Sequence, residues 1–150
     1  MIDRLKKLLH PMKDKAVDPE RQLALAVAAL LVEVMRMDGR IEESERLTIV
    51  AALKHRFHLS ETESDTLIAE ASQETEQSHD LHRFTSKITG NFSTAERIDI
   101  VRELWLVAMA DGKVDPYEEQ LIRRTAELIG IYHHEFIQAK LAAHQKLEKS

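Results

Sequence analysis

Hydrophobic residues recur every three or four positions along most of the chain, which is the spacing of helices that bury one face. Strand-like alternation is nearly absent, and the 150 residues include only four glycines and three prolines. Helix starts are marked by Asp18 before Pro19, and by Ser60 and Ser93, the two serines each followed three positions later by glutamate. The pattern therefore predicts an all-α protein.

Two of the expected helices, 18–37 and 93–108, are apolar around most of their circumference and should lie at the centre of the molecule. The polar stretch 73–80 is the best candidate for a loop in the middle of the chain. The full set of expected helices covers residues 1–10, 18–37, 43–57, 60–75, 81–88, 93–108, 116–129 and 133–147.

An internal repeat organises the chain. The stretches "MDGRIEESE" (37–45) and "ADGKVDPYEE" (110–119) align at an offset of 73 residues, and each joins an apolar helix to an amphipathic one. We call residues 38–45 and 111–118 the acidic corners. The repeat predicts one domain over 1–150, a bundle of seven to eight helices with pseudo-two-fold-related halves at 18–75 and 81–147.

Helix capping explains most of each corner. Gly39 and Gly112 suit the left-handed residue that closes a helix, while Asp115 is a good N-cap with Glu118 three positions later. Asp38 and Asp111 are not explained in this way, because they follow helix C-termini, where the helix dipole disfavours negative charge.

Cation binding is the second interpretation of the corners. Asp38, Gly39, Ile41 and Glu45 fall at positions 5, 6, 8 and 12 of an EF-hand loop, but positions 1 and 3 lack carboxylates, which argues against an ordinary EF-hand. If the pseudo-two-fold axis brings the corners together, their carboxylates need a proton or a cation such as Ca²⁺, Mg²⁺ or Mn²⁺. The candidate ligands are Asp38, Glu45, Asp111 and Glu118, with Glu42 and Asp115 at the rim. Capping alone and capping with an ion both stay open.

The paired corners, each between two helices, resemble the TerB family of tellurite-resistance proteins and the N-terminal domain of the DjlA co-chaperones. The resemblance covers roughly residues 18–137. It implies an all-helical bundle of two related halves, acidic corners proposed to bind metal, and a non-catalytic role in assemblies connected with tellurite resistance or stress. The chain departs from the pattern in its basic N-terminal helix and in having Pro116 in one corner only.

Composition and motifs exclude several classes of function. The net charge of −5 argues against nucleic acid as a partner, and the absence of cysteine removes thiolate metal sites and cysteine nucleophiles. There is no serine nucleophile elbow, glycine-rich phosphate loop or HExxH zinc motif, and the eight histidines suit solvated positions. We therefore expect no catalytic residues, no organic cofactor and a cytoplasmic location.

Residues 1–15 form a basic amphipathic segment with five basic and two acidic side chains. Such a helix either packs on the domain's own acidic surface or makes a weak peripheral contact with an anionic membrane.

The main hypothesis is a non-enzymatic module that binds a protein partner and a divalent cation. One alternative is a structural scaffold without an ion. The other is a metal-dependent hydrolase that uses the carboxylates, for which no residue is an obvious base.

Overall fold

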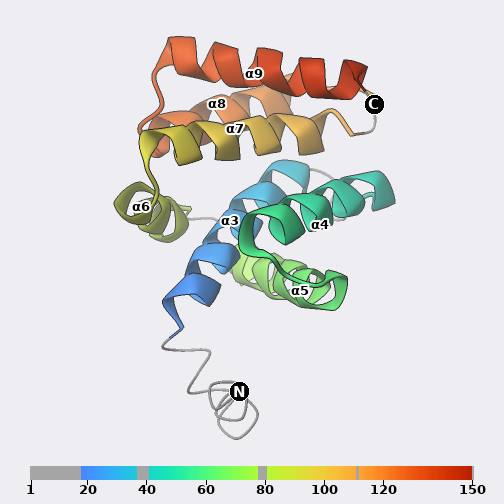
Figure 1. Cartoon of the computed structure of the whole chain (residues 1–150), viewed down its shortest axis with the longest axis vertical. Helices are drawn as coiled ribbons and strands as arrows, with labels where there is room; N and C mark the ends of the chain where they lie inside the picture. The colour runs from blue at the N-terminus through green and yellow to red at the C-terminus, as the bar shows by residue number, and fades with distance from the viewer. Residues whose placement is uncertain (1–17, 37–40, 78–80, 111, 150) are drawn as a thin grey trace, which may run out of the picture.

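The structure, a computed structural model, describes residues 18–36, 41–77, 81–110 and 112–149 (Figure 1). All regular structure in these ranges is helical, which confirms the all-α prediction. The expected helix over residues 1–10 lies outside them. The helices are α3 (Pro19–Met35), α4 (Glu43–Phe57), α5 (Glu61–Gln77), α6 (His82–Asn91), α7 (Thr94–Ala108), α8 (Pro116–Leu128) and α9 (His133–Glu148).

The capping residues identified in the sequence begin the helices as expected. Asp18 Oδ1 accepts hydrogen bonds from the backbone N–H groups of Glu20 and Arg21, at 3.1 and 3.3 Å. Ser93 and Glu96 form a reciprocal box, with the Glu96 N–H donating to Ser93 Oγ and the Ser93 N–H donating to Glu96 Oε1. These bonds satisfy N–H groups that a helix start leaves without partners.

The helix expected over 60–75 is confirmed as α5, which continues to Gln77, so the overlapping prediction of a loop over 73–80 is wrong for residues 73–77. Their polar side chains have tertiary partners that the sequence does not reveal. Thr75 is fully buried, and the Arg36 guanidinium donates to Thr75 Oγ1 and to the Ser72 carbonyl. Glu74 forms an ion pair with Arg83 of α6 at 2.8 Å. These contacts stabilise a helical end that composition alone would assign to a loop.

Helices α3 and α7 lie at the centre and pack against each other, as their apolar circumferences predict. Every residue from Ala26 to Val32 is fully buried, and so is Trp105 of α7. The Trp105 ring packs against Phe136 of α9 with a centroid separation of 5.5 Å. Trp105 is thus a core residue, as expected.

The two halves repeat the same packing. Helix α5 covers α3 as α9 covers α7, while α4 packs on α7 as α8 packs on α3. Helices α3 and α7 also end on the same side of the molecule (Figure 1). Helix α6 is the additional element and packs on α3 and α8. This arrangement agrees with the predicted pseudo-two-fold relation between the halves. None of the described helices is both long and apolar enough to cross a lipid bilayer.

Candidate functional site

The first acidic corner leads into α4, whose first turn is held by Glu45. The Glu45 side chain is buried, with 5% of the residue exposed, and its Oε1 accepts the backbone N–H of Glu42 at 2.8 Å. Ile41 packs against the edge of the core. Glu45 is therefore a buried carboxylate with a structural role as a cap.

The second corner repeats this geometry at the start of α8. Glu118 is 8% exposed, and its Oε1 accepts the backbone N–H of Asp115 at 3.0 Å. Asp115 Oδ1 in turn accepts the N–H of Tyr117 at 2.7 Å. Gly112 has a φ of +90°, the left-handed conformation predicted for a glycine that closes a helix. The capping part of the prediction is confirmed at this corner.

The other proposed ligands divide by what the structure describes. Glu42 and Asp115 are exposed N-cap residues. Asp38 and Asp111, together with Gly39, lie outside the described residues. Within the described ranges no three His, Asp or Glu side chains come together as a metal site. Glu42, Glu45, Asp115 and Glu118 therefore do not form such a group by themselves, and the six-acid set stays a prediction.

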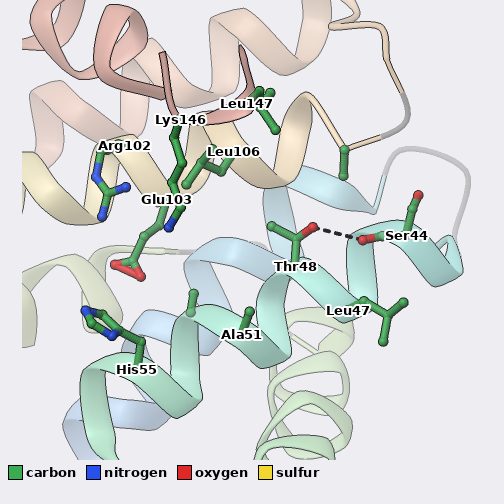
Figure 2. Close-up of a pocket in the computed structure, with 12 residues that line it drawn as sticks. Ser44, Leu47, Thr48, Ala51, His55, Arg102, Glu103, Leu106, Lys146 and Leu147 are labelled. Atoms are coloured by element: carbon green, nitrogen blue, oxygen red, sulfur yellow. Dashed lines mark hydrogen bonds between the residues drawn. The ribbon is translucent and has the colours of Figure 1, made fainter. Parts of the chain in front are cut away.

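A groove of about 470 Å³ lies between α4 and α7 and reaches the C-terminal end of α9 (Figure 2). Its apolar lining includes Leu47, Leu106 and Leu147, of which Leu47 and Leu147 are about half exposed, at 50% and 42%. His55 of α4 and Glu103 of α7 line its polar end. The groove thus combines exposed aliphatic side chains with a few polar groups.

A partly buried ion cluster underlies the polar end of this groove. Arg56 of α4 donates from Nε to Glu103 Oε1 at 2.9 Å and from Nη2 to Asp99 Oδ2 at 2.9 Å. Arg102 Nε donates to the other Asp99 oxygen at 2.8 Å. The Arg56 and Glu103 side chains are only 11% and 7% exposed, so their attraction acts in a region of low dielectric.

The two carboxyl groups of the cluster are shifted in opposite directions. Burial raises the pKa of Glu103 above its ordinary value, although the neighbouring Arg56 charge opposes the change. Burial also acts to raise the pKa of Asp99, but the hydrogen bonds and positive charges of Arg102 and Arg56 outweigh it and lower that pKa.

Sequence reasoning missed both the groove and the cluster. The available signal was Glu103 itself, a glutamate in the central-helix stretch from Ile100 to Ala108, which is apolar apart from Glu103 and Arg102. A buried charge in such a run requires a partner, but its partner Arg56 is 47 positions away in the chain. The described histidines are exposed, as expected: His55, His58, His82, His133, His134 and His144.

Comparisons with known proteins connect this arrangement to one family. The family described as tellurite resistance protein TerB matches residues 24–141. Among solved structures, the chain is similar to a protein of unknown function from Porphyromonas gingivalis W83, with a TM-score of 0.60 and 17% sequence identity over 82% of this chain and 88% of that one. At that identity the likeness concerns the fold alone. No curated protein matches the sequence.

Proposed function

Because this chain belongs to the TerB family of tellurite resistance proteins, we propose that it is a non-enzymatic binding module that holds a divalent cation at its acidic corners and a protein partner on its surface. Ca²⁺, Mg²⁺ and Mn²⁺ are the cations that oxygen ligands favour. The proposed ligands are Asp38, Glu45, Asp111 and Glu118, with Glu42 and Asp115 at the rim.

The observation that carries this proposal is the matched burial of Glu45 and Glu118. The two residues stand 73 positions apart, at the same point of equivalent helices, and each residue is more than nine-tenths buried. A hydrogen bond from a backbone N–H fixes each one. Ligands fixed in this way lose little conformational freedom when a cation binds.

The direction of the central helices also supports the proposed cation site at the acidic corners. Helices α3 and α7 pack together and end on the same side of the molecule (Figure 1). The corners follow these ends directly, so acids from both halves start from the same side of the bundle. Gathering several carboxylates there favours a bound cation over mutual repulsion.

The polar end of the groove supports a non-enzymatic role. A general acid or base must reach the substrate's proton, and a raised pKa in a cleft is a signal for such a group. Glu103 has that signal, but Arg56 binds it through two nitrogen atoms and Asp99 shares the same guanidinium. We therefore assign the cluster a structural role.

Exposed aliphatic residues support a protein partner. Ile137 and Leu141 stand one turn apart on α9, with 37% and 56% of each residue exposed. Residues four positions apart share a helix face, and paired apolar side chains on a polar surface are typical of interaction sites.

Thermal unfolding tests the cation proposal. The wild-type protein, freed of metal with a chelator, is compared at increasing concentrations of Ca²⁺, Mg²⁺ or Mn²⁺. A cation that binds only the folded protein adds about 2.7 kcal/mol of stability at a hundred times its dissociation constant. We expect this gain in the wild type and its loss in Asp38→Asn/Asp111→Asn.

Two further variants separate ion binding from capping. Glu45→Gln/Glu118→Gln keeps an oxygen acceptor for each cap and removes two charges, so it should keep the basal stability and lose the cation effect. Glu76→Gln/Glu148→Gln removes two charges from exposed positions outside the corners and should respond to cation like the wild type. An unchanged midpoint in the wild type at millimolar cation would leave two capped corners and support the scaffold alternative.

A further inference from the structure

The groove between α4 and α7 corresponds to the position that α6 occupies in the other half. In the pseudo-two-fold relation between the halves, α3 is equivalent to α7, and α8 is equivalent to α4. Helix α6 packs on α3 and α8, so a counterpart of α6 would pack on α7 and α4. Arg83 of α6 pairs with Glu74 of α5 at 2.8 Å. The position 73 residues after Glu74 is Leu147, which lines the groove. The groove is therefore the place where a counterpart of α6 belongs.

We propose that residues 1–10 of the same chain are this counterpart and lie as an amphipathic helix in the groove between α4 and α7. The order of segments along the chain supports the assignment. Helix α6 precedes α7 with two residues between them, and residues 1–10 precede α3, the counterpart of α7, with eight residues between them.

The apolar spacing of the two segments is the same. Helix α6 and the residue before it turn Leu81, Phe84 and Ile88 towards the core. Residues 1–10 carry Ile2, Leu5 and Leu9 with the same intervals of three and four positions. Those intervals place three side chains on one helix face, and the aliphatic part of the groove offers Leu47, Leu106 and Leu147 as the opposing surface.

The connecting chain is long enough. Residues 11–18 link the segment to α3, and eight extended residues span up to about 26 Å. That reach equals the full length of α3, because seventeen helical residues rise about 25 Å. Helix α4 runs back along α3 towards its start (Figure 1), so the His55 end of the groove lies in the direction of the connection.

Charge favours contact of the segment with the body of the domain as a whole, whereas the groove itself is lined by Arg102 and Lys146 as well as Glu103. Residues 1–15 carry a net charge of +3, because they contain five basic and two acidic side chains, which leaves −8 on the remaining residues of a protein with a total of −5. A basic segment is attracted to an acidic body, and a short linker keeps its effective concentration high.

Crosslinking of paired cysteines tests the proposal directly, because the native chain has no cysteine. In full-length Lys6→Cys/Ala51→Cys, one thiol stands at the flank of the segment and the other in the groove. A short bis-maleimide should join them within one chain, giving a compact monomer on a gel and a 6–51 linked peptide by mass spectrometry.

The matched control is Lys6→Cys/Arg124→Cys, since Arg124 is the exposed residue of α8 at the position equivalent to Ala51. Its yield should be at least several-fold lower.

A second pair of variants tests the apolar face without affecting the fold of the bundle. Leu5→Ser/Leu9→Ser in the Lys6→Cys/Ala51→Cys protein should remove most of the intrachain product, whereas Lys7→Ser/His10→Ser, on the opposite face, should retain it. Equal yields at residues 51 and 124 would overturn the proposal. Products that join two chains and grow with protein concentration would overturn it in favour of a second copy in the groove. Absence of the intrachain product together with co-sedimentation on phosphatidylserine vesicles would overturn it in favour of a membrane contact.

Discussion

Where α4 meets α7, Arg56 and Glu103 form a buried ion pair, whereas the positions at the 73-residue offset in the other half hold Ile129 and Leu30, both fully buried. The Asp99 position likewise corresponds to Ala26, which is also fully buried. Equivalent positions of the two halves are therefore filled by charged residues in one half and by apolar residues in the other. The difference indicates that the ion cluster is not required for this packing. The cluster lies on the α4–α7 side, where the groove is open, whereas α6 covers the equivalent side of the other half.

The largest expected effect comes from breaking the pair on one side only. Arg56→Ile should leave the Glu103 carboxylate buried without its partner, and Glu103→Leu should leave Arg56 with Asp99 alone. Removing one member of a buried ion pair typically costs about 3–5 kcal/mol, so each single variant should be strongly destabilised. Urea unfolding followed by circular dichroism measures the change.

Replacing both members of the ion pair by the apolar residue types of the other half tests whether the two interfaces are interchangeable. The double variant Arg56→Ile/Glu103→Leu installs the residue types found at positions 129 and 30. Replacing a buried ion pair by apolar residues of similar volume is often neutral or stabilising, so the double variant should recover most of the stability lost in either single one. Additive losses would show that the two interfaces are not interchangeable and that the pair itself stabilises the α4–α7 contact.

The acidic corners are the opposite case, because the two halves use the same chemistry there. Glu45→Ala and Glu118→Ala should each lower the free energy of unfolding by about 1 kcal/mol, the usual cost of a lost helix cap. Both carboxylates accept one cap N–H from a buried position, so the two losses should agree within a few tenths of a kcal/mol. Urea unfolding in chelator measures capping without any cation.

Glutamine serves as the control at both positions. Glu45→Gln and Glu118→Gln retain a side-chain oxygen, so they should cost much less than the alanine variants. A large loss on glutamine substitution in chelator would mean that the charge, and not the hydrogen bond, stabilises the corner.

The acidic corners and the ion cluster also differ in how far the sequence predicts them. Helix capping is local, and a box of residues three positions apart was sufficient to assign Glu118 as the partner of Asp115. The Arg56–Glu103 pair joins residues 47 positions apart, and no local pattern records such a contact. The polar end of α5 escapes prediction for the same reason, since Thr75 is buried and its hydrogen-bond partner Arg36 is 39 positions away.

The smallest expected effect is a pH dependence that differs in sign between the two carboxyl groups of the cluster. The pKa of Asp99 is lowered in the folded protein, so the stability it contributes is present above its unfolded value of 3.8 and is lost as the pH falls through the folded value. The pKa of Glu103 is raised, so its contribution to stability is complete below its unfolded value of 4.5 and declines as the pH rises through the folded value.

Urea unfolding of Asp99→Asn and Glu103→Gln at a series of pH values measures both contributions. The advantage of the wild type over Asp99→Asn should shrink in acid, and its advantage over Glu103→Gln should grow. The same trend in both variants would contradict the opposite shifts and would indicate that Arg56, not burial, controls the ionisation of Glu103.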